Sequence, residues 1–406
     1  MKKILFINYC AYIPGEKAIK RTFYLFQMML EQGFDVTFLT SDFNHYEKKE
    51  RDIDKFFLDY PEYKNKVEFV HMDKYSKNIS FKRFNKNKKC EKNILDWFKK
   101  NGNIYDVVYI SWPTYGLVNN MYKYCQEFKC KIVLDINDLW PDSLKLFIKN
   151  NFFYNLFTGK IQKKNHLAFS YADGIIAVSK EYLNIAAEYN TKAEFKLAVY
   201  IGSMLEKFDI GIKNHKDSIM KNTDEFWITY IGTLGASYDL DTVIKAIKII
   251  RTSSKKNIRF KILGQGPIET DLRKLTKSLA CDGIDFEGFK EYGVMAAYLD
   301  KSDICINCIK RRASQSIINK AADYFSSGKP ILNCGPCIEM ENLISNNNAG
   351  LNYESENVND LVKKILYLYD HQTESIIMGK NARKLAEEEF DRRKTHQKII
   401  DMIVNM

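Results

Sequence analysis

The sequence of 406 residues has no apolar run approaching the roughly 18 to 20 residues that a membrane-spanning helix requires. Glycine and proline are few, at 19 and 7, whereas hydrophobic residues make up 45% and aromatic residues 14%. Such a composition excludes a mainly disordered chain. At about 150 residues per domain, the length predicts two to three packed domains of a soluble protein.

Cysteines number nine, an odd count spread over a long chain, which argues against a disulfide framework and favours a reducing compartment. We therefore expect a cytoplasmic location. The stretch Ile4 to Ile7 follows two lysines like the start of a signal peptide, but it ends at Asn8 and no small-residue cleavage site follows. We interpret it as a buried first strand.

Basic residues are concentrated in the first half of the chain. Residues 1–200 carry +9 of the formal net charge of +11. The excess peaks between Lys82 and Lys100, where eight basic side chains face two acidic ones and aromatic residues are interleaved. Two interpretations stay open: a solvated surface leading into a helix, or a surface that meets anionic lipid head groups. Nucleic acid is not expected as a partner, because no binding-module signature accompanies the charge.

Short apolar segments rich in Ile, Val, Phe and Tyr alternate with amphipathic stretches of ten to fifteen residues, the pattern of βαβ units with parallel sheets. The expected strands of the first half are residues 3–8, 35–40, 66–71, 107–111, 131–135 and 174–178. Those of the second half are residues 226–231, 259–263, 284–286, 304–307, 331–333 and 351–353.

A polar stretch at residues 209–224 interrupts the alternation and is interpreted as a linker. The expected organisation is therefore a first domain at 1–208, the linker at 209–224, and a second domain at 225–385. A C-terminal helix at 386–406 is expected to pack back on the first domain. Both domains are predicted to be doubly wound α/β units.

Glycines follow three expected strands of the second half. In open parallel sheets, ligands bind outside the carboxyl ends of the strands, where glycines let the backbone approach and helix N-termini offer amide donors to anions. One glycine in such a turn has an equally good steric explanation. Three glycine turns in one sheet favour a phosphate-bearing ligand at its carboxyl edge. They contain Gly232 and Gly235, Gly264 and Gly266, and Gly335.

A helix is expected near residues 317–327, with Lys320 and Asp323 three positions apart on one face. An ordinary surface ion pair between them stays open as an interpretation. Because the segment ends in Gly328-Lys329-Pro330 and continues directly into an apolar strand, we expect this face to point toward the interdomain side.

This segment resembles the retaining glycosyltransferases of family 4, in which a helix of the form Asn-Lys-x-x-Asp/Glu-Tyr, followed by Gly-Lys-Pro and a strand, lines the donor site. The resemblance extends over almost the whole chain and implies an α/β GT-B fold, with two Rossmann-like doubly wound domains facing a central cleft. The matching residues of the helix segment are Asn319, Lys320, Asp323, Tyr324, Gly328, Lys329 and Pro330. Residues 135–143 and 172–179 look like segments of bacterial surface-polysaccharide members, and residues 230–235 and 263–267 are further matches.

The resemblance also implies roles for individual residues. Asp323, an acceptor-only carboxylate when ionised, would bind the ribose hydroxyls of a nucleotide sugar. Lys320 would neutralise the diphosphate, with backbone amides near the glycine turns. The base would lie beside Phe289 and Lys290. The implied donor-binding residues are Gly15, Gly232, Gly235, Gly264, Gly266, Phe289, Lys290, Asn319, Asp323 and Gly335, and the implied catalytic residues are Asn137, Asp138 and Lys320.

The sequence departs from the family pattern at several positions. Family members usually have a basic residue a few positions after the strand that ends at Gly232, and residues 236–239 offer none. Gln315 stands where an acidic residue is common, and Glu16 stands where a second glycine often follows Gly15. Candidates for the missing cation are Lys320, Arg311 and Arg312.

Two cysteine pairs, Cys305-x-x-Cys308 and Cys334-x-x-Cys337, have the internal spacing of a zinc site. The 25 residues between the pairs exceed the roughly 15 to 20 of ordinary zinc ribbons. Buried small hydrophobes are the favoured interpretation. Because no Asp-x-Asp motif stands in a convincing loop, we expect a metal-independent reaction with no cofactor.

Three functions stay open. The favoured one is a retaining glycosyltransferase, hexosyl- or N-acetylhexosaminyl-type, with a nucleotide-diphosphate donor, UDP-linked by preference. Its acceptor is a lipid-linked chain or oligosaccharide in capsule, O-antigen or other surface polysaccharide synthesis, and its site is the inner face of the plasma membrane. The second is a nucleotide-sugar epimerase of the same fold, although no acid and base pair stands out in the donor-facing loops. The third is a catalytically degenerate donor-binding subunit.

Overall fold

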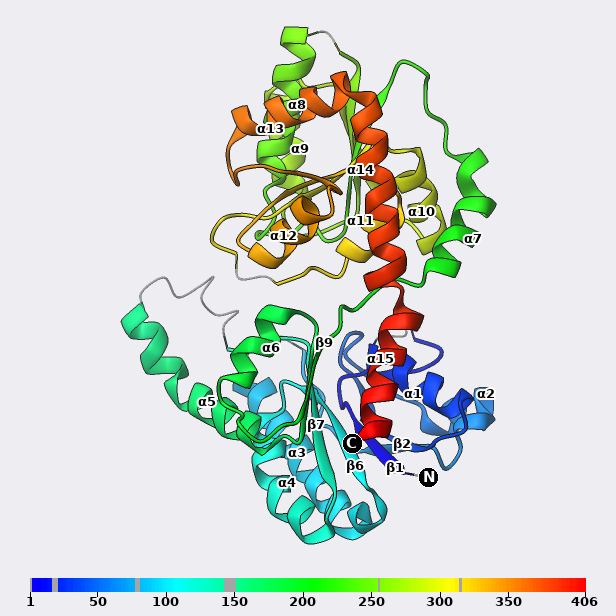
Figure 1. The fold of residues 1–406 in the computed structure, drawn as a ribbon, viewed down its shortest axis with the longest axis vertical. Coiled ribbons are helices and arrows are strands. Elements are labelled where there is room, and N and C mark those ends of the chain that lie inside the picture. The colour runs from blue at the N-terminus through cyan, green and yellow to red at the C-terminus, as the bar shows by residue number, and fades with distance from the viewer. Residues whose placement is uncertain (1, 17–20, 77–80, 142–150, 255, 314–315) are drawn as a thin grey trace. The chain divides into compact units, whose positions relative to one another are not determined.

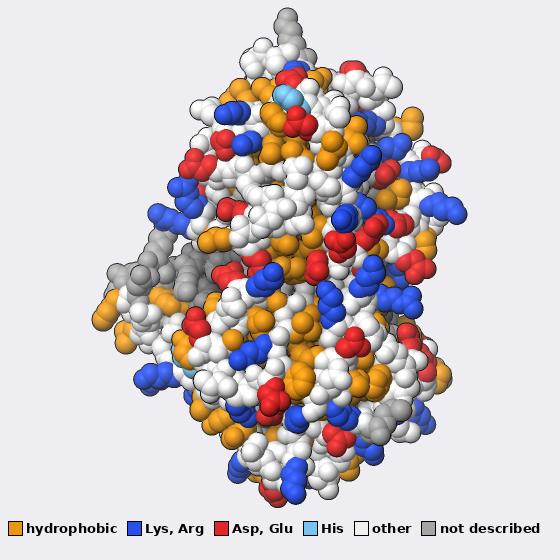
Figure 2. Space-filling model, viewed as in Figure 1, with side chains coloured by type: hydrophobic (Ala, Val, Ile, Leu, Met, Phe, Trp, Pro, Cys, Tyr) orange, Lys and Arg blue, Asp and Glu red, His pale blue; other side chains and the backbone are white. Residues whose placement is uncertain are grey.

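The computed structural model describes residues 2–16, 21–76, 81–141, 151–254, 256–313 and 316–406 (Figure 1). The chain divides into two compact units. Unit 1 consists of Met1–Val199 and His396–Met406, and unit 2 of Tyr200–Thr395. Figure 2 shows lysine and arginine side chains spread over the visible surface of both units.

In the described part of unit 1, seven strands form one parallel sheet in the order β5-β2-β1-β6-β7-β8-β9. Strand β6 is buried along its whole length, as expected for a strand covered on both faces. The strands are β1 (Lys3–Ile7), β2 (Asp35–Ser41), β5 (Val67–Val70), β6 (Val107–Trp112), β7 (Lys131–Ile136), β8 (Gly174–Ala177) and β9 (Phe195–Ala198), and a short hairpin joins β3 (Phe43–Asn44) to β4 (Lys49–Glu50).

Helices cover both faces of this sheet. Leu5 and Ile7 of β1 pack with Phe98 of α3, whereas Ile4 and Phe6 pack on the opposite face, because successive side chains of a strand alternate. Helices α3 (Phe81–Asn101), α4 (Tyr115–Phe128), α5 (Asn151–Tyr171) and α6 (Lys180–Ala187) contribute to the first face. Helices α1 (Arg21–Glu31) and α2 (Ile53–Asp59) and the last part of α15 (Arg392–Asn405) contribute to the second.

Unit 2 has the same construction. Within its described residues, six strands form a parallel sheet in the order β12-β11-β10-β13-β14-β15. The strands are β10 (Phe226–Ile231), β11 (Ile258–Leu263), β12 (Ile284–Gly288), β13 (Ile304–Cys308), β14 (Ile331–Cys334) and β15 (Gly350–Asn352).

Two hydrophobic clusters lie on the two faces of this second sheet. Helices α8 (Leu240–Ser254), α9 (Glu269–Ser278) and α13 (Val358–Asp370) contribute to one. The other receives helices α7 (Leu205–His215), α10 (Tyr292–Lys301), α11 (Ala321–Ser326), α12 (Ile338–Asn346) and the C-terminal end of α14 (Gln372–Leu385). Both units are therefore doubly wound α/β structures, which confirms the predicted fold class.

The expected linker at residues 209–224 is largely helical. Helix α7 runs from Leu205 to His215 and packs against α10 of the same unit. Gly211 approaches Gly293 so closely that a Cβ on Gly211 would lie 2.6 Å from the Cα of Gly293. The polar residues that suggested a linker lie on the exposed face of this helix, and Phe208 lies on its buried face.

The boundaries of the units also differ from the expected ones. The chain passes from unit 1 to unit 2 between Val199 and Tyr200, and the C-terminal segment assigned to unit 1 begins at His396. Residues 386–395 stay with unit 2, where Phe390 is buried in the core beside Tyr200. Among the described residues, no helix combines the length and the hydropathy needed to cross a lipid bilayer.

Candidate functional site

The glycine turns lie at the carboxyl edge of the sheet of unit 2. Gly232 follows β10 with a φ of 120°, in the left-handed region that favours glycine. A Cβ on Gly264 would overlap the carbonyl oxygen of Gly232, and one on Gly266 would overlap that of Leu234. Gly264 and Gly266 thus allow the loops after β10 and β11 to pack together. Around Gly235, by contrast, the nearest atoms to a Cβ belong to a tyrosine ring 3.8 Å away.

Lys320 stands immediately before α11, and its ammonium reaches the turn at Gly232. The Lys320 Nζ would lie 3.1 Å from a Cβ on Gly232. It is enclosed by two aromatic rings, with 3.8 Å to the ring centroid of Tyr230 and 3.9 Å to that of Tyr238. The nitrogen is buried and has no hydrogen-bond partner among the described residues. Burial lowers the pKa of Lys320 to about 7, against a small opposing effect of the Cys308 thiol.

The motif around Lys320 fixes its position. Tyr324 is one turn further along, and its hydroxyl accepts a hydrogen bond of 3.0 Å from the backbone N–H of Ile231 at the end of β10. Tyr238 is held by an isolated bridge to Ile309 after β13. Helix α11 and the loop that carries Tyr238 are therefore both attached to strand ends, so the lysine and its two rings are positioned by the sheet.

The Asp323 carboxylate forms a hydrogen bond with a tyrosine and not with Lys320. The Tyr292 hydroxyl, at the start of α10, donates a hydrogen bond of 2.8 Å to Asp323 Oδ1. Burial raises the pKa of Asp323 to about 6, and the Tyr292 hydrogen bond and the charge of Arg392 oppose the rise. The surface ion pair between Lys320 and Asp323 that the sequence left open is not formed, because Lys320 Nζ has no partner among the described residues.

The remaining predicted donor residues of unit 2 lie at the same edge. Phe289 follows β12 and is 68% exposed. Lys290 Nζ lies 3.7 Å from Glu287 Oε2. Asn319 is exposed just before Lys320. A Cβ on Gly335, after β14, would lie 2.9 Å from the Cβ of Ile309, so this glycine is explained by packing.

Two buried polar atoms near Gly335 were not anticipated from the sequence. Asn307 Oδ1 and Ser316 Oγ have no hydrogen-bond partner among the described residues, and both line a small cavity with Gly335. The Asn307 amide nitrogen donates 2.7 Å to Asn333 Oδ1, and Asn333 donates 2.8 Å to Asn352. This row of asparagines across three neighbouring strands holds Asn307 in place.

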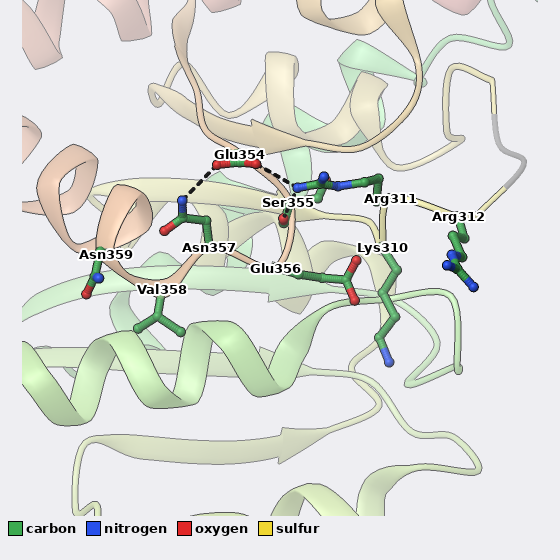
Figure 3. A pocket seen from close by; sticks show the side chains of 9 residues that line it. All are labelled: Lys310, Arg311, Arg312, Glu354, Ser355, Glu356, Asn357, Val358 and Asn359. Carbon is green, nitrogen blue, oxygen red and sulfur yellow. Dashed lines mark hydrogen bonds and ion pairs between the residues drawn. The ribbon is translucent and has the colours of Figure 1, made fainter.

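A cavity of about 680 Å³ lies after β13 and β15 at the same edge (Figure 3). Arg311 Nη2 is 2.7 Å from Glu354 Oε1 on its wall, so its charge is already balanced. Of these two residues, Lys320 is therefore the better candidate for the missing cation beside Gly232. Gln315 lies outside the described residues. The cavity is lined by Lys310, Arg311, Arg312, Glu354, Ser355, Glu356, Asn357, Val358 and Asn359.

In unit 1, Asn137 and Asp138 follow β7. Asn137 Nδ2 donates to the carbonyl oxygen of Asp135 at 3.0 Å and to Ser111 Oγ at 3.3 Å, and Asp138 is exposed. Asp135, in the same motif, is fully buried, and both its oxygens lie 3.1 Å from Arg21 Nε. Asp135 therefore has a structural partner, whereas Asn137 and Asp138 stand at the carboxyl edge.

Gly15 has a φ of 82° in the loop after β1. The next residue, Glu16, accepts hydrogen bonds from Arg51 Nε at 2.8 Å and from Asn44 Nδ2 at 2.9 Å. Arg51 also donates to the carbonyl oxygen of Ala11. The carboxylate that replaces the second glycine of the family pattern thus ties the loop after β1 to the loop after β2.

The two cysteine pairs are buried within unit 2. Cys305 and Cys308 belong to β13, Cys334 ends β14, and Cys337 precedes α12. Cys305 Sγ lies 3.4 Å from Ser327 Oγ, and Cys334 Sγ lies 3.5 Å from the carbonyl oxygen of Ile309. No group of three or more His, Cys, Asp or Glu residues in the described ranges is arranged to hold a metal ion.

Two doubly wound units in one chain are the construction of the GT-B fold. Three solved structures of this class match over nearly the entire chain. HepE of Anabaena, in complex with UDP, has a TM-score of 0.70 at 13% identity and 100% coverage of both chains. Sucrose-phosphate synthase of Thermosynechococcus elongatus has 0.72 at 14%, covering 100% of this chain and 99% of its own. WaaG, a glycosyltransferase involved in lipopolysaccharide biosynthesis, has 0.64 at 14%, with 98% and 99% covered. At identities this low, the structural similarity establishes the fold alone.

The sequence adds a family match within unit 2. Residues 225–371 match the family model described as Glycosyl transferases group 1. This segment runs from the start of β10 to the end of α13 and contains Lys320 and Asp323. Together, the family match and the fold support a glycosyltransferase of group 1. The curated proteins contain no match to this sequence.

Proposed function

We propose that the protein is a retaining glycosyltransferase that moves a sugar from a UDP-sugar to a lipid-linked or oligosaccharide acceptor in the synthesis of a surface polysaccharide. The observation that carries this proposal is the ammonium of Lys320, which is buried beside the Gly232 turn without an anionic or hydrogen-bonding partner among the described residues. An isolated buried charge is unfavourable, and a diphosphate is the partner that would compensate it. UDP in the HepE complex supports the choice of nucleotide.

The geometry suggests how the donor is held. Lys320 and the backbone amides near Gly232 and Gly235 bind the diphosphate, whose negative charge grows as the sugar leaves. A desolvated ammonium interacts with that charge more strongly than one in water does. Asp323 accepts hydrogen bonds from the ribose hydroxyls, and Tyr292 orients the carboxylate from the other side. The exposed ring of Phe289 offers a surface for the base.

The proposal assigns the acceptor to unit 1 and gives Asn137 and Asp138 a catalytic role in the sugar transfer. We further propose that the enzyme is peripheral on the inner face of the plasma membrane, through its basic first unit. Helix α3 carries much of that charge, but Lys89 already pairs with Asp73 at 3.1 Å and Lys99 with Asp96 at 3.0 Å. We also propose that turnover needs no divalent metal, because the Lys320 ammonium supplies positive charge where the diphosphate would lie.

Binding measurements test the core of this proposal. Thermal shift and calorimetry with UDP, GDP, ADP and their sugars should show saturable stabilisation by a uridine ligand. Lys320→Met should abolish most of that stabilisation. Lys310→Met, which removes a lysine from the neighbouring cavity, is the matched control and should leave it intact. Equal loss in both variants, or no uridine binding at all, would contradict the assignment.

Product analysis separates the alternatives. Incubation with a UDP-sugar and an undecaprenyl-diphosphate oligosaccharide should give a longer glycan with the anomeric configuration of the donor. A new UDP-sugar formed without acceptor would instead identify an epimerase. Binding without turnover on any donor would identify a catalytically degenerate subunit.

A further inference from the structure

Two buried polar side chains of unit 2 line the same small cavity at the carboxyl edge of the sheet. They are Asn307, near the end of β13, and Ser316, on the segment that leads to Lys320, and they are 1% and 7% exposed. Neither Asn307 Oδ1 nor Ser316 Oγ has a hydrogen-bond partner among the described residues. The cavity is too narrow for a water molecule in the free protein, so both atoms carry the cost of an unsatisfied buried polar group.

A row of asparagine amides determines which atom of Asn307 is left over. At the far end of the row, Asn352 Nδ2 donates 3.0 Å to the carbonyl oxygen of Glu341, which can only accept. Asn352 Oδ1 therefore accepts from Asn333 Nδ2 at 2.8 Å, and Asn333 Oδ1 accepts from Asn307 Nδ2 at 2.7 Å. Each amide orientation follows from the one before it. The free atom of Asn307 is thus an acceptor, and its partner must be an N–H or O–H donor.

The strand order relates this cavity to the proposed donor site. The sheet runs β12-β11-β10-β13-β14, with Phe289 after β12, the Gly232 turn after β10, and the cavity at the ends of β13 and β14. In a nucleotide sugar, the base, the ribose, the diphosphate and the sugar follow one another in that order. With the base at Phe289 and the diphosphate at Gly232, the sugar extends toward β13 and β14. Those strands are one and two spacings of about 4.8 Å further on, within reach of a hexose and its substituents.

The remaining walls of the cavity add an apolar surface to its two polar groups. A sugar hydroxyl would satisfy Asn307 and Ser316 but leave that surface without a partner. An acetamido group matches all three parts. Its N–H donates to Asn307 Oδ1, its carbonyl oxygen accepts from the Ser316 hydroxyl, and its methyl group packs on the apolar side chains. The apolar side chains of the cavity are Ile309, Ile318, Cys334, Cys337 and Met340.

We propose that Asn307 and Ser316 bind the acetamido group of the donor sugar, so that a UDP-N-acetylhexosamine is preferred to the corresponding UDP-hexose. The inference rests on the proposed function and names the class of sugar that its site accepts. Binding must widen the cavity, and Met340 on its wall suits this, because an unbranched side chain with three rotatable bonds adapts its shape. Two new hydrogen bonds compensate for the widening, because neither polar atom has a partner among the described residues.

Calorimetry with matched pairs of donors tests this assignment. UDP-N-acetylglucosamine and UDP-N-acetylgalactosamine are compared with UDP-glucose and UDP-galactose, and at least one acetamido sugar should bind tenfold or more tightly than its hexose. UDP-glucosamine, which lacks the carbonyl and the methyl group, should lose that gain. If both hexoses bind as tightly as their acetamido counterparts, the proposal is wrong.

Two variants assign the gain to the cavity. Ser316→Ala should reduce the preference for the acetamido sugar about fivefold, and Asn307→Leu should bring it within about twofold of the hexose, while both retain the affinity for UDP. Ser316→Ala should melt at the wild-type temperature or above it, because the hydroxyl that it removes has no partner among the described residues. Ser345→Ala, which removes an exposed hydroxyl from the outer end of the asparagine row, is the control and should leave the preference unchanged.

The affinity for UDP separates this inference from the function on which it rests. If UDP binds and its binding depends on Lys320, but Ser316→Ala leaves the preference for acetamido sugars unchanged, the cavity assignment alone is wrong. If no uridine ligand binds, the proposed function is wrong, and this inference with it. Asn307→Leu also removes the hydrogen-bond donor to Asn333, so Ser316→Ala decides the outcome where the asparagine variant does not fold.

Discussion

Replacing Lys320 with methionine should separate the stability of the free protein from its affinity for the donor. In the free protein, the ammonium is buried between Tyr230 and Tyr238 and has no hydrogen-bond partner among the described residues. Its removal relieves a desolvation cost, so the melting temperature of the free variant should stay the same or rise. Loss of one member of a buried charge pair costs about 2 to 5 kcal/mol, which corresponds to a thirtyfold or greater loss of affinity for a UDP-sugar.

The pH dependence gives the same reasoning a sharper form. The pKa of Lys320 is lowered to about 7 in the free protein, and a bound diphosphate should raise it toward the ordinary value of about 10.4. Binding then takes up a proton. As far as Lys320 alone is concerned, the affinity should be full below pH 7 and fall by up to tenfold per pH unit above it. The pKa of Asp323 is raised to about 6, so affinity should also fall as the pH drops below 6 and the carboxylate is protonated.

Calorimetry of a UDP-sugar between about pH 6 and pH 9, in buffers of different ionisation enthalpy, measures both the affinity and the proton uptake. A UDP-sugar is preferred to UDP because its esterified diphosphate has no terminal phosphate that titrates near neutral pH. Lys320→Met should bind weakly with no decline between pH 7 and pH 9. In the free wild type, unfolding takes up the proton, so the stability contributed by this group should increase from pH 7 toward 10. A wild-type affinity that is flat between pH 7 and pH 9, or a variant that melts well below the wild type, would refute the reasoning.

Three further predictions follow from the described contacts. Asp323→Asn should weaken UDP-sugar binding by tenfold or more, and Tyr292→Phe should weaken it by about fivefold. Because the Tyr292 hydrogen bond lowers the pKa of Asp323, Tyr292→Phe should also move the loss of affinity at low pH to a higher pH. Calorimetry checks both variants. Arg21→Met should lower the free energy of unfolding by about 3 to 5 kcal/mol in urea, because it leaves Asp135 buried and unpaired, whereas Arg311→Met at an exposed pair should cost less than about 1 kcal/mol. Chelation with EDTA should leave sugar transfer unchanged in a product assay, and restoration of lost activity by Mg²⁺ or Mn²⁺ would contradict the proposed metal independence.

The positions of most strands along the chain could be predicted because buried parallel strands are nearly continuous apolar segments. Strand β10 was predicted with its observed bounds, Phe226 to Ile231, all of it buried. Strand β9, Phe195 to Ala198, was missed because it is a short edge strand in which no residue is fully buried. Helix α7 was mistaken for a linker for a related reason, since most of its residues face solvent and only Leu205, Phe208 and Gly211 are buried.

The site could be predicted only in part, because a motif gives residues and not their partners. The helix motif identified Lys320 and Asp323, and spacing along a helix suggested that they pair. Their true neighbours come from other strands and helices: Tyr230 and Tyr238 for the lysine, and Tyr292 for the carboxylate. Tyrosines are common in this chain, which has 25, so no sequence signal distinguished these three.

The loop after Gly232 gives a reason for the missing basic residue. It supplies the Tyr238 ring that covers Lys320, and the cation comes from α11 instead. The positive charge beside the diphosphate should therefore be transferable from α11 to the loop after Gly232. In a Lys320→Met background, Ala236→Arg places a cation on the exposed part of that loop and should recover affinity for the UDP-sugar by about tenfold, or about 1.4 kcal/mol.

The recovered affinity should also change its dependence on pH. An arginine stays protonated at all accessible pH values, so the double variant should bind equally well at pH 7 and pH 9, unlike the wild type. Ala236→Gln in the same background is the control, because it adds a side chain and hydrogen bonds without charge. If glutamine restores as much as arginine, the diphosphate does not need a cation at this turn, and the role given to Lys320 is wrong.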